Sequence, residues 1–284
     1  METGKHSRMA EGSAYLRAVH MVLDGQPKIL EDPLAATLLG PGFAERLEGD
    51  RERLASAPLV KARSLICMRS RFAEDELKAA IGRDVGQYVL LGAGLDTSPY
   101  RPGHPAQGVH TFEVDHPDTQ RWKLERLRAA DVSFSERLHH VPVDFEKDAL
   151  GERLVACGFD RKRPAFFSWL GVSYYLNRES VLEVFRFVAG LPPSSQIVFD
   201  FVMDDAELND TERQAMRSIT AFVQRFGEPW LCRFGPADLQ QTLRNLGFSH
   251  TEHFSHARAT SRYFDGRSDG LYLDFTTQMM SAIV

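Results

Sequence analysis

A glycine-rich turn is the first part of the sequence whose residue types could do chemistry. Gly92 and Gly94 come directly after the apolar run 87–91 (QYVLL). Glycine lets a backbone approach a ligand closely and adopt torsion angles that other residues avoid. Because ligands bind beyond the carboxyl ends of strands in an open parallel sheet, this position predicts a ligand site. A plain strand-to-helix turn is the alternative explanation of the glycine pair.

The residues around the turn narrow the choice of ligand. A dinucleotide fingerprint has Gly or Ala three positions after its second glycine, where this sequence has Thr97. The sequence also lacks the Gly-Lys-Ser/Thr of a phosphate-binding P-loop. Both observations argue against a nucleotide held through its phosphates.

Acidic side chains close the next two predicted strands. Asp115 follows the run 109–114, and Asp144 follows the run 139–143 with Phe145 next to it. A carboxylate at Asp115 could accept two hydrogen bonds from a ribose diol, although it could also be the N-cap of the next helix. Asp144 could accept from an adenine amino group while Phe145 packs on the ring. Together the three strand ends indicate a ligand that contains adenosine.

The predicted elements place these residues at one edge of a sheet. Short apolar runs, typical of strands buried on both faces, lie at residues 87–91, 109–114, 139–143, 165–169 and 197–203. Helical patterns lie between them at 119–130, 148–157 and 178–191. This alternation predicts an α/β fold with a doubly wound parallel sheet. Two more strands are expected at 250–254 and 271–276, after a helix at 236–246.

Helical segments are expected on both sides of the alternating region. Residues 1–82 form a predicted helical cap with helices at 14–23, 32–39 and 59–81, the second opened by Asp32 as N-cap with Pro33 at the first helical position. Residues 204–234 interrupt the alternation with polar helical sequence and a turn at 227–229. We expect this segment to be an insertion that covers the top of the sheet. The prediction is a single domain, residues 1–284.

Composition bounds the possible partners. The hydrophobic fraction of 43% and the charged fraction of 26% are those of a globular protein, and the net charge of −5 argues against a nucleic-acid partner. The scattered cysteines fit a reducing compartment. No apolar run approaches the length of a membrane helix, and the first residues lack a signal-peptide pattern. We expect a cytoplasmic protein with no membrane partner. His139 and His140 alternate between the faces of a strand, and the pair His253 and His256 lacks carboxylates at ligand spacing, so no metal site is expected. The oligomeric state stays open.

Short motifs over nearly the whole chain share one pattern. The most specific is 92–97 (GAGLDT) followed by Tyr100 and Arg101, and the others are 32–35 (DPLA), 69–72 (RSRF), 112–117 (FEVDHP), 141–145 (VPVDF), 167–176 (FSWLGVSYYL), 227–230 (GEPW), 246–248 (LGF) and 262–264 (RYF). In these motifs the sequence resembles the leucine carboxyl methyltransferase family and its bacterial relatives.

The resemblance implies a fold and a methyl donor. The fold is a seven-stranded, Rossmann-like methyltransferase sheet with an antiparallel last strand, and the donor is S-adenosylmethionine, which leaves as S-adenosylhomocysteine. Arg69 would bind the donor's methionine carboxylate, because a guanidinium matches a carboxylate in two places. Arg71 is a near competitor, and Arg17 is a candidate second cation.

The resemblance also implies the other donor contacts: Gly92 and Gly94 facing the donor, Asp115 at its ribose, and Asp144 with Phe145 at its adenine. The sequence departs from the family at two positions. Leu170 stands where many relatives have Glu, so that a polar contact to the donor is lost or replaced by a backbone group. Ser98 stands where relatives often have Arg.

Methyl transfer from a sulfonium is an in-line displacement, which needs an oxygen nucleophile about 3 Å from the methyl group. A carboxylate is already ionised at pH 7 and needs no general base, whereas a phenol benefits from one. His20, His116 and His256 are the candidate bases, although each is more typical of a surface or packing histidine. The sequence therefore leaves carboxylate and hydroxyl acceptors open.

Aromatic residues are the candidates for contact with the acceptor. Tyr174 and Tyr175 follow the fourth strand, where the methyl group should lie, and either hydroxyl could hold a substrate oxygen. Other candidates are an anion-holding pair, Arg262 and Tyr263, and an apolar pocket lined by Trp169, Phe222, Phe226 and Trp230. The expected function is O-methylation of a small-molecule or natural-product acceptor. The alternatives are a protein C-terminal carboxyl methyltransferase and a non-catalytic donor-binding module on the same fold.

Overall fold

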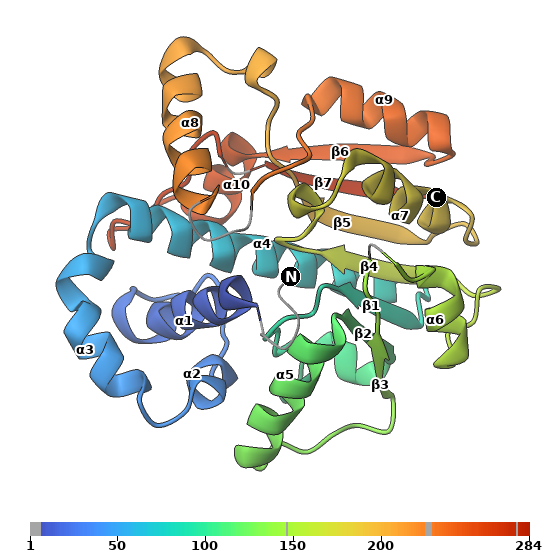
Figure 1. The fold of residues 1–284 in the computed structure, drawn as a ribbon, viewed down its shortest axis with the longest axis horizontal. Coiled ribbons are helices and arrows are strands. Elements are labelled where there is room, and N and C mark those ends of the chain that lie inside the picture. The colour runs from blue at the N-terminus through green and yellow to red at the C-terminus, as the bar shows by residue number, and fades with distance from the viewer. Residues whose placement is uncertain (1–6, 146, 225–228, 277) are drawn as a thin grey trace.

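A mixed sheet forms the centre of the protein (Figure 1). The computed structural model describes residues 7–145, 147–224, 229–276 and 278–284. Within them the sheet has seven strands in the order β3-β2-β1-β4-β5-β7-β6. The strands are β1 (Gln87–Leu91), β2 (His110–Asp115), β3 (Leu138–Pro142), β4 (Ala165–Trp169), β5 (Gln196–Asp200), β6 (His250–Ser255) and β7 (Gln278–Ile283). Neighbours among β1 to β5 pair in parallel, and β7 runs antiparallel to β5 and β6.

Helices cover both faces of this sheet, which explains why its strands are apolar throughout. Val89 and Leu91 face one core, built with α6 (Leu150–Ala156), α7 (Arg178–Ala189) and α9 (Pro236–Leu246). Tyr88 and Leu90, which alternate with them, face a second core built with α4 (Ala57–Ile81) and α10 (His256–Tyr263). The predicted doubly wound α/β fold with seven strands is confirmed.

The strand order reverses at β1, since β2 lies on one side of it and β4 on the other. In doubly wound sheets this switch point leaves a crevice at the carboxyl ends of the strands. The N-terminal helices α1 (Arg8–Leu23) and α2 (Leu34–Leu39) lie beside that edge, with α2 next to α5 (Pro117–Ala129), and α3 (Phe43–Leu54) lies further out (Figure 1). The helix α2 begins one residue later than predicted, with Pro33 rather than Asp32 as its N-cap residue, although Asp32 Oδ1 accepts from the Ala35 amide at 3.1 Å.

Residues 204–234 contain a 3-10 turn (Asp205–Glu207) and α8 (Asp210–Gln224). Leu208 and Met216 join Val202 in an apolar cluster, against which Tyr174 and Trp230 pack. The segment therefore rests on the loop after β4. Its description as an insertion within a single domain stays a prediction.

The predicted last strand at residues 271–276 is wrong, because the strand is β7, seven residues further along the chain. In 271–276 the backbone bonds to side chains: Ser64 Oγ accepts from the Tyr272 amide, and Asp274 Oδ1 accepts from the Thr276 amide. Polar residues obscured β7 in the sequence. Gln278 and Ser281 are buried in the sheet, where each hydrogen-bonds another side chain.

Candidate functional site

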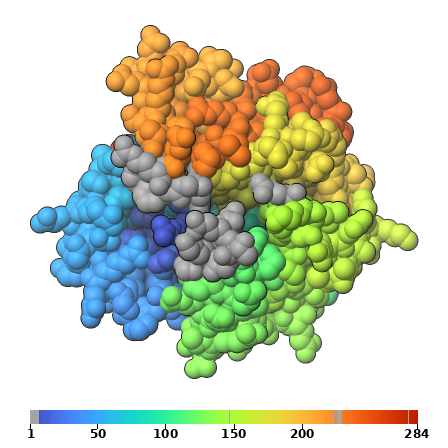
Figure 2. Space-filling model, in the orientation of Figure 1, coloured from blue at the N-terminus to red at the C-terminus, as the bar shows by residue number. Residues whose placement is uncertain are grey.

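A cavity of about 580 Å³ opens at the carboxyl ends of β1 to β4. Its wall consists of the turn after β1, the ends of β2 and β3, the loop after β4, the start of α1, part of α4, and two residues of the 204–234 segment. Figure 2 shows this face of the molecule hollowed near its centre, beside the blue atoms of the N-terminal helices. The volume lies within the range of small-molecule sites, about 300–1,000 Å³.

The turn after β1 needs glycine at two positions. Gly92 has a φ of +67°, and a Cβ there would lie 2.3 Å from Val172 Cγ2. Gly94 has a φ of +46°, and its Cβ would lie 3.1 Å from Ala10 Cβ in α1. The Gly92 amide donates to the Val114 carbonyl of the adjacent strand at 2.8 Å. The turn is thus fixed to the sheet, with bare backbone facing the cavity.

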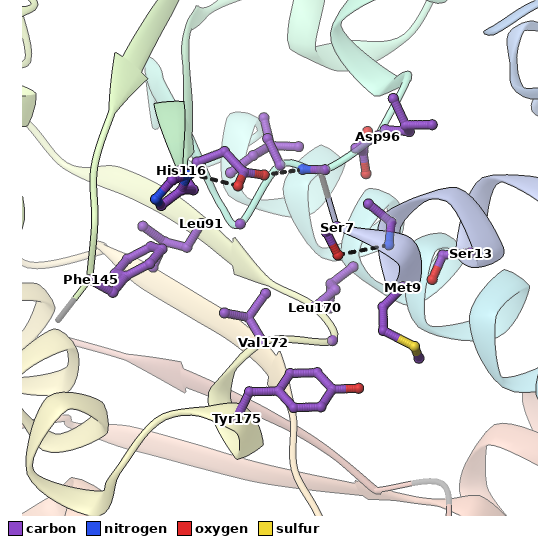
Figure 3. A pocket seen from close by; sticks show the side chains of 18 of the residues that line it. Ser7, Met9, Ser13, Leu91, Asp96, His116, Phe145, Leu170, Val172 and Tyr175 are labelled. Carbon is purple, nitrogen blue, oxygen red and sulfur yellow. Dashed lines mark hydrogen bonds between the residues drawn. The ribbon is translucent and has the colours of Figure 1, made fainter. Parts of the chain in front are cut away.

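Asp115 lies at the end of β2 and binds the same turn. Its carboxylate accepts hydrogen bonds from the amides of Gly94 and His116, the latter at 2.7 Å (Figure 3). Burial raises the pKa of Asp115 above its ordinary value, against these two bonds, which act to lower it. The carboxylate therefore lies in the cavity wall with its orientation fixed by backbone groups.

Phe145 and His116 lie at the same end of the cavity (Figure 3). The His116 Nδ1 accepts from the Asp118 amide at 3.3 Å, so the proton of the neutral ring is on Nε2. Asp144, next to Phe145, also lines the cavity and forms an ion pair of 2.7 Å with Lys147. Sequence reasoning treated His116 only as a possible base and missed it as a lining residue at this end.

Three arginines of α1 and α4 line the cavity: Arg8, Arg17 and Arg69. Arg69 of α4 forms a buried ion pair of 2.9 Å with Asp200. Burial acts to lower the pKa of Arg69, but the charge of Asp200 outweighs burial and raises this pKa above its ordinary value. Arg17 of α1 donates from Nε to Asp32 at 2.7 Å and from Nη2 to the Leu95 carbonyl at 2.6 Å. Arg71, the competitor of Arg69, pairs with a surface carboxylate on its own helix and does not line the cavity.

Asp96 is a lining residue that the sequence analysis did not single out. Its Oδ1 accepts from the Ser98 amide at 2.7 Å. Burial acts to raise the pKa of Asp96, but the charges of Arg17 and Lys123 outweigh it and hold the pKa below its usual value. In Figure 3 this carboxylate lies on the side of the cavity away from His116 and Phe145. A fixed negative charge therefore accompanies Arg17 and Arg69 in the cavity wall.

Of the two adjacent tyrosines, the structure brings Tyr175 and not Tyr174 to the cavity wall. Tyr174 packs against Trp230, with ring centroids 5.5 Å apart, and its carbonyl accepts from the Leu231 amide at 2.7 Å. Leu170 lines the cavity as an apolar contact.

Several other candidates lie elsewhere. Arg262 and Tyr263 both bind Asp75 of α4, so they do not form an anion-holding pair at the cavity. Trp169 is fully buried in the core against α7. The remaining candidates away from the cavity wall are His20, which is buried against Asp24, His256, which begins α10, and Trp230.

Some expectations fall outside what the structure describes. Phe226 and the side chain of Phe222 are not among the described residues. Within the described ranges, no group of three or more His, Cys, Asp or Glu side chains is arranged to hold a metal ion. The described helices include none with the length and apolar character needed to cross a bilayer.

Comparisons with solved structures support the fold. A methyltransferase of provisional assignment from Thermobifida fusca is 16% identical, with a TM-score of 0.56, and the alignment covers 99% of this chain and 95% of that one. A DUF574 family protein from Streptomyces avermitilis is 17% identical, with a TM-score of 0.53, over 94% and 95% of the two chains. At these identities the similarity concerns the fold alone.

Sequence comparison identifies the family. A protein from Bacillus subtilis, provisionally named an S-adenosyl-L-methionine-dependent methyltransferase, is 29% identical over 95% of both chains. A Mycobacterium avium protein with the same provisional name is 30% identical over 72% of this chain and 70% of its own. The profile of the leucine carboxyl methyltransferase family matches residues 10–189. This chain therefore belongs to the leucine carboxyl methyltransferase family.

Proposed function

We propose that this protein transfers the methyl group of S-adenosylmethionine to an oxygen atom of a small-molecule acceptor, and that the acceptor oxygen belongs to a carboxylate. Membership of the family supports a methyltransferase that depends on S-adenosylmethionine. The observation that carries the rest is the cavity at the switch point, with charged groups fixed on one side and apolar side chains with one tyrosine on the other.

At the end formed by β2 and β3 the residues fit adenosine. Asp115 would accept from the ribose hydroxyls, since its orientation is already set by two amides. Phe145 would pack on the adenine ring and Asp144 would accept from its amino group. His116, with its proton on Nε2, would donate to a nitrogen or oxygen of the nucleoside.

On the side of α1 and α4 the charges fit the amino-acid part of the donor. Arg69 and Arg17 would bind the carboxylate, and Asp96 would accept from the ammonium group. Gly92 and Gly94 leave the space that the donor needs between these groups and the adenosine end. The zwitterionic amino-acid part of the donor would thus lie beside charges of both signs.

When bound, S-adenosylmethionine supplies a methyl group on a positively charged sulfur, which an oxygen nucleophile displaces in line. The chain's own groups hold the acceptor. Val172, Leu176 and Leu231 offer apolar surface, and the hydroxyl of Tyr175 would hold an acceptor oxygen. Among the described lining residues the only histidine is His116, at the adenosine end (Figure 3). An acceptor that is already ionised, such as a carboxylate, suits an acceptor side where the described lining residues include no histidine base.

Methylation of a protein's C-terminal carboxylate is the second candidate, because the family is named for leucine carboxyl methylation. The chemistry would be the same, and the acceptor would be a chain end that enters the apolar side of the cavity. The two proposals differ only in what surrounds the carboxylate.

Thermal unfolding tests the donor first. We expect S-adenosylhomocysteine to raise the melting temperature and NADH to leave it unchanged, since Thr97 and the turn do not suit a dinucleotide. Transfer of labelled methyl groups then tests the acceptor, with panels of small apolar acids, phenols and peptides. Label that base releases indicates a carboxyl ester, and base-stable label indicates an ether. Stabilisation by NADH alone would overturn the proposed donor. If all of the transferred label is stable to base, the proposed carboxylate acceptor is overturned.

A further inference from the structure

Asp200, at the end of β5, lies behind the cavity wall rather than in it. Its side chain is nearly fully buried, with 6% exposed. One carboxylate oxygen binds Arg69 Nη1 at 2.9 Å, and the other accepts from the Gly171 amide at 2.7 Å. Its carbonyl accepts from Ser173 Oγ at 2.8 Å. One residue thus binds both a cation of the cavity and the loop after β4.

Gly171 completes this arrangement from the other side. It has a φ of +75°, and a Cβ there would lie 2.7–3.0 Å from the three guanidinium atoms Nη2, Nη1 and Cζ of Arg69. The guanidinium therefore lies flat against bare backbone, in space that any side chain at position 171 would fill. Burial between Asp200 and Gly171 leaves it little freedom to turn.

We infer that Asp200 is a positioning residue for donor binding: through Arg69 it fixes the group that meets the donor's carboxylate, and through Gly171 it fixes the loop that carries Tyr175. This inference rests on the proposed donor site. An arginine on a flexible stem loses rotamer freedom when it binds a ligand, and a carboxylate that already orients it removes that cost from the binding step. The same residue ties the donor's carboxylate site to the acceptor's loop.

The alternative is a buried ion pair that serves folding only. The two roles differ in which ligands they affect. A positioning role acts only on ligands that carry the amino-acid part of the donor, whereas damage to the fold weakens every ligand of the cavity. S-adenosylhomocysteine has that part, and 5′-methylthioadenosine lacks it.

The first experiment measures both ligands by calorimetry on Asp200→Asn. The amide cannot accept from Arg69 and Gly171 together as the carboxylate does, so we expect S-adenosylhomocysteine to bind about 10-fold more weakly. Binding of 5′-methylthioadenosine should stay within about 2-fold of wild type. Equal weakening of both ligands, or no change in either, would overturn the inference.

A double-mutant cycle then tests whether Asp200 acts through Arg69. We expect Arg69→Met alone to weaken S-adenosylhomocysteine by about 100-fold, and Asp200→Asn to add less than about 2-fold in that background. If the affinity losses of the two single variants multiply in the double variant, Asp200 acts independently of Arg69, and that result would contradict the inference. The double variant also removes both buried charges at once, so that it avoids the unpaired charge of either single variant.

Two further variants keep the test decisive. Gly171→Ala displaces the guanidinium without changing a charge, and should show the same selective loss if Asp200→Asn does not fold. Asp24→Asn is the matched control, because Asp24 pairs with Arg63 at 2.7 Å in an equally buried position away from the cavity. It should lower the melting temperature and leave the affinity ratio of the two ligands unchanged. If wild type fails to bind S-adenosylhomocysteine, the proposed function fails, whereas the inference fails when wild type binds and Asp200→Asn keeps the wild-type ratio.

Discussion

At the end of the cavity formed by the turn after β1, backbone hydrogen bonds hold the site residues, while beneath residues 204–234 side-chain packing adds to the hydrogen bonds that hold the loop after β4. The Gly92 amide is bonded to β2, and amides orient the carboxylate of Asp115. Near the tyrosines a small apolar cluster around Met216 also supports the loop after β4, and the amides of Leu231 and Cys232 donate to the Tyr174 carbonyl.

This difference suggests that the two ends of the cavity have separate functions. The first end consists of strand ends and a glycine turn, which the fold itself supplies and which would bind the donor under the proposed function. Under the proposed function, the second end would select the acceptor through the apolar side chains that the loop after β4 and residues 204–234 present. Changes at the two ends should therefore affect different ligands.

The largest effect is expected for Gly92→Ala. Its Cβ would overlap Val172 and its φ is strained, so we expect S-adenosylhomocysteine to bind at least about 100-fold more weakly and the free energy of unfolding to fall by about 3 kcal/mol. Calorimetry and thermal unfolding measure the two effects. Gly103→Ala is the matched control, because Gly103 has a φ of +76° with no atom within 4 Å of its Cβ. It should cost only about 1 kcal/mol and keep donor affinity.

Asp96→Asn tests the charged side of the donor site. Loss of the carboxylate should weaken S-adenosylhomocysteine by about 10-fold, because a neutral amide no longer pairs with the ammonium group. The ligand 5′-methylthioadenosine has no ammonium group and should bind as before. As a control, Asp84→Asn removes one exposed charge and should change neither affinity. Equal losses for both ligands would place the role of Asp96 in the turn rather than at the donor.

Tyr175→Phe addresses the acceptor end. We expect kcat/KM for the best acceptor of the panel to fall by about 5-fold, the size of one hydrogen bond to substrate, with affinity for S-adenosylhomocysteine unchanged. Tyr272→Phe, which removes an exposed hydroxyl outside the cavity, should leave both values unchanged. A loss of donor affinity in Tyr175→Phe would break the division between the two ends.

The smallest effect is a pH dependence of donor binding. Because burial raises the pKa of Asp115, this group takes up a proton at a higher pH than an ordinary aspartate. The ribose hydroxyls donate to the ionised form, so affinity for S-adenosylhomocysteine should fall by a few fold as the pH is lowered toward that pKa. Calorimetry from pH 8 to pH 5 should show this decline in wild type. A decline of the same size in Asp115→Asn would assign it to another group.

The same contrast explains what the sequence could predict. The groups at the ends of β1, β2 and β3 are each next to an apolar run, so local pattern located Gly92, Asp115 and Phe145. Most of the sheet followed from the same runs. The strand β7 did not, because Gln278 and Ser281 interrupt its apolar pattern and find hydrogen-bond partners only within the folded sheet.

Long-range pairs were out of reach of the sequence. Arg69 and Asp200 are 131 residues apart in the chain, and no local signal joins them. Trp169 was expected to line an apolar pocket with other aromatic residues beneath the 204–234 segment, yet it faces the core with Phe167 on the same side of β4. Which tyrosine faces the cavity depended in turn on how the 204–234 segment packs on Tyr174.

A crystal structure with S-adenosylhomocysteine tests the central claim most directly. The account predicts adenine beside Phe145, ribose hydroxyls on Asp115, and the amino-acid carboxylate on Arg69, with sulfur facing the apolar side that carries Tyr175. Density for the ligand elsewhere on the protein, or in the cavity with the adenine at Arg69, would contradict it.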